Sequence, residues 1–368
     1  MREPMDIRKD KVWPMKPHTK AKHAILRRYF EAWLPILASW AKSILYIDGF
    51  AGPGVYKDGE PGSPIIVLQA AVNHQSPIEA DVQFIFIEAD SERFAVLEKE
   101  LGKLGSLPAN FHVTSHHGEF GDLEKQIDEI RTQGKTLVPT LAFIDPFGYT
   151  GFPMRLVHKI LMNRYCEVLI TFMVRDLDRF CEVQEESVRE LYGNDDWTHC
   201  RSIEEFTTRR QCLIREYGKQ LRVGGANYVL PFEMADENGT TIYYLIYATK
   251  HLKGMQVMKD AMVSVDKSMN YRFADLVPQE QRRLMEFGLE DTWIDLAAQE
   301  VWQHFSGSTV TVQKVGEYVT GETIYPFRKS ILTNLASMSP PAIRYVDQPR
   351  KRGTFPNDVR IFFEFHQS

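Results

Sequence analysis

Residues 43–56 read S-I-L-Y-I-D-G-F-A-G-P-G-V-Y, an apolar run that stops at an acid and then opens into glycines. Short apolar runs bounded by turn residues are typical of buried strands in a parallel sheet. Glycines after such a strand let the backbone approach a ligand, and ligands of open α/β sheets bind beyond the carboxyl ends of the strands. The stretch therefore predicts a first strand with a nucleotide-binding exit, and a tight turn without a ligand is the alternative.

The composition sets broad limits on the class of protein. A chain of 368 residues is long enough for one large domain or two ordinary ones. Its net charge of −5 excludes a basic nucleic-acid coat, so any nucleic-acid contact must come from a local basic patch. No signal peptide and no apolar run long enough to span a membrane occur, so we expect a cytoplasmic protein without membrane association.

The four cysteines are Cys166, Cys181, Cys200 and Cys212. They are 12 to 19 residues apart, and none forms a C-x-x-C pair. This spacing predicts reduced, buried thiols and no metal site.

Strands and helices alternate after the first strand. Further strands are expected at 82–88, 111–115, 140–145 and 167–173, with amphipathic helices between them. This alternation predicts a parallel sheet covered by helices on both faces.

The pattern changes after the fifth strand. Residues from about 175 to 222 read as helices without a strand, a helical insertion. Segments 228–234 and 241–249 are two strands joined across Asn238-Gly239, a strong hairpin signal. A parallel sheet that ends in an antiparallel hairpin is the Rossmann-like layout of class I methyltransferases, and it disfavours a nicotinamide-dependent oxidoreductase. We place this domain at 1–265.

A second domain is expected at 273–368. Two short helical patterns at 310–319 and 325–337 precede strands at 343–346 and 359–365, which predicts a winged helix-turn-helix. Basic residues lie in and near the turn between those strands and could contact phosphates: Arg344, Arg350, Lys351 and Arg352. A solvated basic turn is the alternative.

Two acids end the first two strands. Glu88 is placed to accept both ribose hydroxyls of a bound adenosine, although an acid at a strand end can also cap the next helix. Asp48 would then face the amino-acid part of the same ligand.

The fourth strand ends in Asp145-Pro146-Phe147-Gly148. An exocyclic base amine is a poor nucleophile because its lone pair is delocalised into the ring. The Asp145 carboxylate and the Pro146 carbonyl could accept its two hydrogens, and Phe147 or Tyr149 could stack on the base. An Asp-Pro turn in a loop is the alternative.

An ordered set of motifs resembles the three-Cys-motif partner protein (TcmP) family over nearly the whole chain. The set is Lys22-His23 at the start of a helix, D-G-F-A-G-P-G-V-Y, G-S-P, F-I-E-A-D, H-G-E-F and F-I-D-P-F-G. It is also similar to large-subunit ribosomal RNA adenine-N6 methyltransferases, which carry D-P-P-Y where this chain has D-P-F-G. D-P-F-G is itself similar to the motif of tRNA guanine-N2 methyltransferases.

The resemblance implies S-adenosylmethionine as the cofactor, with Asp145 at the acceptor site. The implied cofactor-binding residues are Lys22, His23, Asp48, Gly49, Phe50, Gly52, Gly54, Ser63, Glu88, Ala89, Glu119 and Phe120. Glu119 is shifted relative to the acid that contacts the donor's adenine in the ribosomal enzymes. The resemblance also implies a protein partner with three cysteines at radical-SAM-like spacing.

Two functions follow as hypotheses. One is a methyltransferase that acts on an exocyclic nucleobase amine of DNA or RNA, with the base flipped toward Asp145. The other is a module that binds the cofactor and nucleic acid and acts as the partner of the three-Cys protein, without methyl transfer of its own.

Overall fold

The computed structural model describes residues 12–180, 183–266, 272–274, 289–347, 351 and 354–366. The chain divides into two compact units, Met1–His251 with Phe273–Leu276, and Leu252–Arg272 with Val277–Ser368. Each unit is built on its own sheet.

The first unit alternates strands and helices. Its elements in chain order are α1 (Pro17–Ala38), β1 (Ser43–Asp48), α2 (Ser63–Val72), β2 (Asp81–Glu88), α3 (Ser91–Gly102), β3 (Phe111–His117), η1 (Phe120–Asp122), α4 (Leu123–Thr132), β4 (Thr140–Ile144), α5 (Met154–Leu161), β5 (Cys166–Phe172), α6 (Val174–Phe180), α7 (Glu185–Tyr192), η2 (Asp196–Ser202), α8 (Phe206–Val223), β6 (Tyr228–Ala235) and β7 (Thr241–Thr249).

The strand order confirms the predicted fold class. The sheet runs β3-β2-β1-β4-β5-β7-β6-β8, and the short strand β8 (Arg272–Ala274) forms its edge. Strands β1 to β5 are parallel, whereas β7 runs antiparallel to both β5 and β6. The β6–β7 turn contains Gly239 at φ 74°, a conformation that glycine adopts without strain. This is the Rossmann-like class I methyltransferase topology.

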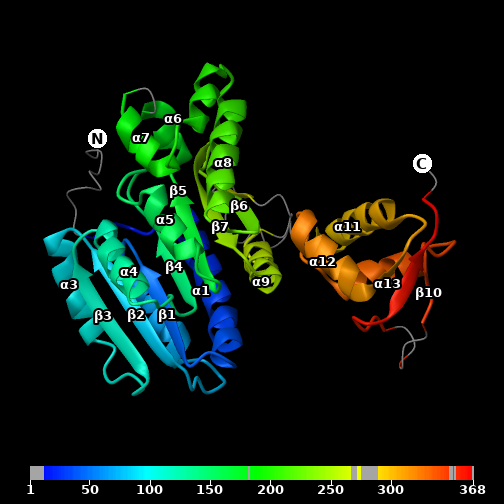
Figure 1. Cartoon of the computed structure of the whole chain (residues 1–368), viewed down its shortest axis with the longest axis horizontal. Helices are drawn as coiled ribbons and strands as arrows, with labels where there is room; N and C mark the ends of the chain where they lie inside the picture. The colour runs from blue at the N-terminus through cyan, green and yellow to red at the C-terminus, as the bar shows by residue number, and fades with distance from the viewer. Residues whose placement is uncertain are drawn as a thin grey trace. The chain divides into compact units, whose positions relative to one another are not determined.

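Both faces of the sheet are buried. Leu45 and Ile47 of β1 belong to a core cluster with residues of α4, α5 and α8. Tyr46 points to the other face and packs edge-on against Phe30 of α1, with ring centroids 5.5 Å apart. Figure 1 shows α4 and α5 in front of the strands. The continuous apolar run at 44–47 is thus explained by a strand buried on both sides.

The predicted helical insertion lies between β5 and β6 as α6, α7, η2 and α8. One prediction within it is wrong. Cys200 and Cys212 are buried, as expected, but they are joined in a disulfide rather than reduced. The packing of η2 on α8 brings them together, and sequence spacing does not reveal such a contact. Cys166 is a free, buried thiol, and Cys181 lies outside the described residues.

The second unit combines helices with a small antiparallel sheet. Its elements are α9 (Leu252–Val263), α11 (Leu289–Phe305), β9 (Thr309–Thr311), α12 (Val312–Glu322), α13 (Lys329–Ser337), β10 (Ile343–Tyr345) and β11 (Arg360–Phe363). The strands pair in the order β10-β11-β9. The two short helices and the following strand pair lie where the sequence predicts them, and their role as a winged helix-turn-helix stays a prediction.

The boundary between the units differs from the predicted one, because α9 belongs to the second unit rather than to the first. The Lys259 ammonium of α9 is fully buried and donates hydrogen bonds to four backbone carbonyls. The acceptors are those of Val319, Thr320, Thr323 and Tyr325, at 2.7 to 3.2 Å. A single lysine thus links α9 to the end of α12. The two partners are 60 residues apart in the sequence, and the spacing of apolar residues does not reveal such a contact.

A bilayer-spanning helix needs about 20 apolar residues in a row. None occurs in the part of the chain that the structure describes.

Candidate functional site

Three acids lie at the carboxyl edge of the sheet. Asp48 ends β1, Glu88 ends β2, and Asp145 directly follows β4. Strand β1 pairs with β2 on one side and with β4 on the other, so the three strand ends are neighbours. The pocket at this edge is lined by Trp13, His23, Phe50, Ala51, Gly52, Pro53, Gly54, Val55, Tyr56, Gly62, Ser63, Asp145 and Phe147.

Glu88 fixes the glycine loop to the sheet. Its carboxylate accepts hydrogen bonds from the backbone N–H of Gly52 at 2.9 Å and of Asp90 at 2.8 Å. Burial raises the pKa of Glu88, and the two N–H groups oppose that shift. A carboxylate has about four lone-pair positions, so two hydroxyls could still donate to it.

Backbone conformation and close packing explain why glycine occupies several positions of the loop. Gly52 and Gly54 adopt φ angles of 62° and 71°, which side chains with a Cβ rarely adopt. A Cβ on Gly62 would lie 2.9 Å from the Gly54 backbone, and one on Gly49 would lie 2.5 Å from the Phe120 ring. The backbone at the β1 exit is therefore tightly folded, and Gly52 faces open space.

Asp48 is fully buried at the base of this loop. Burial raises its pKa to about 7, hydrogen bonding from the Ser63 side chain opposes the rise, and the Asp145 carboxylate adds to it. The backbone N–H of Phe50 donates to Oδ1 at 3.3 Å. Oδ2 finds no hydrogen-bond partner among the residues that the structure describes.

Two more buried polar atoms lie near the acids of this edge. His23 Nδ1 and the Tyr46 hydroxyl also lack a partner within the described residues. Burial, with a further contribution from Lys22, lowers the pKa of His23 to about 3, so its ring is neutral. The Asp48 and Asp145 charges add to burial in raising the pKa of Tyr46. Buried polar atoms in native proteins are almost always paired, so these three atoms are suited to hydrogen bonds with a polar ligand or water.

Asp145 is not free in this state. The ammonium of Lys22, on the first turns of α1, donates a short hydrogen bond to its carboxylate. Both side chains are mostly buried, with 8% and 19% of their surface exposed. The resemblance predicted both residues for the site, and the structure brings them into direct contact.

Aromatic side chains form the rim of the pocket. Phe147 is 49% exposed and meets Trp13 edge-on at 4.9 Å, and Tyr56 meets Trp13 at 6.2 Å. The Arg93 guanidinium lies 5.0 Å from the Trp13 ring and 5.2 Å from the Phe147 ring. Phe147 is the exposed ring among these three, and an exposed ring beside a cation is suited to stacking on a planar ligand.

Sequence reasoning missed Trp13, Tyr46, Tyr56 and Arg93. Tyr46 could have been found, because it lies two residues before Asp48 on one strand and therefore faces the same side. Trp13 and Arg93 have no local signal, since only the folded chain brings them to Phe147.

Some predicted residues lie away from the pocket. Tyr149 is buried in the core, and its hydroxyl donates to Gln184 at 2.8 Å. Glu119 is exposed and caps η1, where its backbone N–H donates to the Asp122 carboxylate at 2.8 Å. The Phe120 ring lies 6.0 Å from the Phe50 ring, and the Ala89 carbonyl contacts the His117 ring. These four do not line the pocket, and neither do five other predicted residues, which lie in or next to the elements around it: Lys22, Asp48, Gly49, Glu88 and Pro146.

The basic residues of the second unit are only partly described. Arg344 is exposed, donates to Glu364 at 2.9 Å and covers the Phe362 ring. Lys351 is exposed, while Arg350 and Arg352 lie outside the described residues. Phosphate contact by these residues stays a prediction.

No family model and no curated protein matches this sequence. Among solved structures the chain is similar to Trm1 from Pyrococcus horikoshii in complex with S-adenosyl-L-methionine (12% identity, TM-score 0.34, 69% of this chain and 64% of that one). It is also similar to the METTL16 methyltransferase domain (14%, 0.32, 60% and 66%) and to a methyltransferase candidate from Porphyromonas gingivalis W83 (12%, 0.27, 60% and 40%). The match spans less than two thirds of each of these three chains. At such TM-scores the likenesses carry no argument about ligand or substrate, and the methyltransferase fold rests on the strand order.

Proposed function

We propose that this protein is an S-adenosylmethionine-dependent methyltransferase that acts on an exocyclic nucleobase amine of DNA or RNA. The observation that supports it is the group of unpaired buried polar atoms on His23, Tyr46 and Asp48, at the carboxyl edge of a class I methyltransferase sheet. Such atoms are suited to hydrogen bonds with the polar groups of a ligand.

The residues of the first strands fit the cofactor. Glu88 has acceptor positions left for ribose hydroxyls, and Gly52 leaves the backbone open to close approach. The unpaired Asp48 oxygen is suited to the amino group of the methionine part. When bound, S-adenosylmethionine would supply an electrophilic methyl group on its sulfonium sulfur.

The acceptor side is formed by the chain after β4. Asp145 can accept one hydrogen of the amine and the Pro146 carbonyl the other, which holds the nitrogen lone pair toward the methyl donor. The exposed Phe147 ring can stack on the base, with Arg93 beside it. Because Lys22 already pairs with Asp145, an incoming amine must share or displace that ammonium.

A nucleic acid would also need contacts outside this pocket. The second unit, with Arg344 and Lys351, is proposed to bind the nucleic-acid backbone. A three-Cys-motif protein is the proposed protein partner. Both proposals rest on the sequence pattern and the resemblance.

Calorimetric titration with S-adenosylmethionine tests the donor site. We expect binding by the wild type, at least tenfold weaker binding by Glu88→Ala and by Asp48→Asn, and unchanged binding by Glu79→Ala, an exposed acid on the same unit. Wild-type protein that does not bind the cofactor would refute the proposal.

Methyl transfer tests the acceptor site. A tritium-methyl screen against tRNA, ribosomal RNA and DNA should give incorporation that Asp145→Ala reduces by about 10²-fold or more, with cofactor binding retained. Cofactor binding without incorporation into any polymer, with or without the partner, would instead favour the second candidate, a recognition module without methyl transfer.

A further inference from the structure

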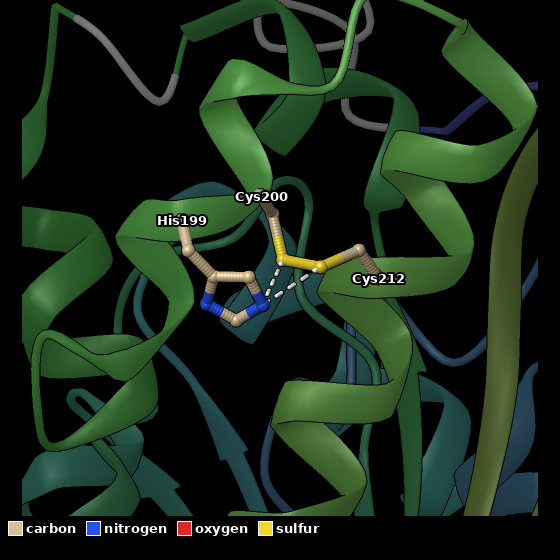
Figure 2. Close-up of side chains that lie close together, drawn as sticks. All are labelled: His199, Cys200 and Cys212. Carbon is tan, nitrogen blue, oxygen red and sulfur yellow. Dashed lines mark hydrogen bonds between the residues drawn. A yellow bond between two sulfur atoms is a disulfide. The ribbon is translucent and has the colours of Figure 1, made fainter.

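A histidine and two cysteines meet in the helical insertion, away from the pocket. His199 and Cys200 lie on η2, and Cys212 lies on α8 (Figure 2). The Nε2 atom of His199 is 3.3 Å from Cys212 Sγ and 3.8 Å from Cys200 Sγ. All three possible ligand atoms lie within 4.8 Å of one another.

The His199 ring is held in the orientation that a metal ligand needs. Its Nδ1 atom lies 2.6 Å from the backbone carbonyl of Asp196. A carbonyl oxygen only accepts, so Nδ1 carries the proton and the neutral ring directs its Nε2 lone pair at the two sulfurs. An imidazole fixed through its other nitrogen by a carbonyl is the usual outer-shell arrangement of a metal-bound histidine.

A buried carboxylate lies beside the histidine of this group. Glu216 follows Cys212 by one helical turn on α8 and is only 3% exposed. Its Oε1 atom lies 3.7 Å from His199 Nε2. Lys219 and Arg215 lie 2.9 and 3.7 Å from the same oxygen. These cations would offset the negative charge of two thiolates and a carboxylate around a divalent ion.

We propose that His199, Cys200, Cys212 and Glu216 bind Zn²⁺ when the Cys200–Cys212 disulfide is reduced. A dithiol reductant gives two electrons to the disulfide and becomes a disulfide itself, which leaves two protein thiols. Those thiols release two protons to solvent as their thiolates bind the ion. The oxidised and the zinc-bound chain exclude each other, because the same two sulfurs form either the S–S bond or the metal ligands.

The spacing of the donor atoms fits this ion. Tetrahedral Zn²⁺ has Zn–S bonds of about 2.3 Å and Zn–N bonds of about 2.0 Å, so its ligand atoms lie roughly 3.3 to 3.8 Å apart. The two His199–sulfur distances and the His199–Glu216 distance already fall in this range. On reduction the two sulfurs must separate, and the Glu216 carboxylate, which is not in the group of donor atoms within 4.8 Å of one another, must turn toward them. Mixed thiolate and imidazole donors at tetrahedral spacing favour zinc over magnesium or calcium.

Zinc content after reduction tests the site. The full chain is reduced with a dithiol, incubated with ZnCl₂, dialysed and assayed for bound metal, with CoCl₂ as a spectroscopic probe. We expect one zinc per reduced wild-type chain, none in the oxidised chain, and the absorption bands of tetrahedral thiolate-bound cobalt. Loss of an outer-shell partner weakens metal binding by roughly 10- to 100-fold. His199→Ala removes a ligand itself, so we expect its zinc affinity to fall by more than that.

Control variants separate this site from the other thiols. Cys166→Ser and Cys181→Ser should bind zinc like the wild type, while Cys212→Ser should not. His199 is exposed, so His199→Ala is expected to fold, and its thermal unfolding should not respond to zinc, whereas that of the reduced wild type should shift upward. Zinc-free reduced wild type, or unchanged binding by Cys212→Ser, would overturn the proposal and leave a purely structural disulfide.

Discussion

The two ends of the first sheet each bury a carboxylate beside α1, and the two carboxylates differ in their hydrogen-bond partners. At the amino edge, Glu167 of β5 accepts hydrogen bonds from the hydroxyls of Tyr29, Tyr247 and Thr249. At the carboxyl edge, Asp48 of β1 keeps an oxygen without a partner in the described chain. Both are buried and both have a raised pKa, for which burial is the largest cause.

The difference separates a structural cluster from a functional one. A satisfied network in a low-dielectric interior fixes the packing of its members, here α1 against β5 and β7. An unsatisfied carboxylate costs folding free energy and persists where a ligand uses it. Burial and a raised pKa are common to both carboxylates, and the hydrogen-bond partners differ: Glu167 has three hydroxyl donors, whereas one oxygen of Asp48 has none in the described chain.

The largest expected effect on stability is at the amino edge, where Glu167 has all its hydrogen-bond partners. Glu167→Ala removes the acceptor that three buried hydroxyls share, and only the bond between the two tyrosine hydroxyls remains. We expect the free energy of unfolding to fall by about 4 kcal/mol, measured by urea denaturation. Glu167→Gln keeps an acceptor and should cost clearly less. A loss below about 1 kcal/mol in Glu167→Ala would contradict a structural role for the network.

At the carboxyl edge, replacing the buried carboxylate of Asp48 should raise the stability of the protein rather than lower it. The pKa of Asp48 is about 7 in the folded chain, above its ordinary value of 3.8. The folded state therefore binds more protons than the unfolded state between those values, and this contribution to stability is lost as the pH rises toward and past 7. Asp48→Asn removes the cost of the buried charge, so we expect it to be about 3 kcal/mol more stable than wild type at pH 8.

The pH dependence is the sharper measurement. The advantage of Asp48→Asn over wild type should shrink from pH 8 to pH 5, where wild-type Asp48 is protonated. Asp58→Asn, an exposed acid on the same unit, should show no such trend. A difference that does not change with pH would mean that Asp48 does not titrate in this window.

Local pattern explains why much of the fold and part of the site were predictable. Acids that end neighbouring parallel strands must meet at one edge, and this placed Asp48, Glu88 and Asp145. The Asn238-Gly239 turn likewise fixed the β6–β7 hairpin. These features depend on residues within a few positions of each other.

Features that depend on distant residues were missed. The Lys22–Asp145 pair joins residues 123 apart, and resemblance pointed to both positions without showing their contact. The Cys200–Cys212 disulfide and the transfer of α9 to the second unit also arise from packing between elements. Tyr149, one of two residues considered for stacking on the base, lies in the core, and spacing along the chain does not reveal this.

A tyrosine substitution at the amino edge has a smaller expected effect. Tyr29 is fully buried, and its hydroxyl bonds Glu167 and Tyr247. Tyr29→Phe keeps the ring and removes those bonds, so we expect a loss of about 1 to 2 kcal/mol in unfolding free energy. Cofactor affinity in the calorimetric titration should stay unchanged, because this edge lies at the other end of the strands.

The matched substitution at the carboxyl edge is Tyr46→Phe. Of the four changes it should have the smallest effect on stability, and compared with Tyr29→Phe it should have the larger effect on cofactor binding. Tyr46 is equally buried, but its hydroxyl has no partner in the described chain. Removing an unsatisfied buried hydroxyl relieves a desolvation cost, so Tyr46→Phe should leave stability unchanged or raise it by up to about 1 kcal/mol. If the ligand pairs with this hydroxyl, the same variant should bind S-adenosylmethionine about tenfold more weakly, since one net hydrogen bond is worth about 1 kcal/mol. A Tyr46→Phe variant that loses stability as Tyr29→Phe does would mean that both edges are structural, and the contrast between them would fail.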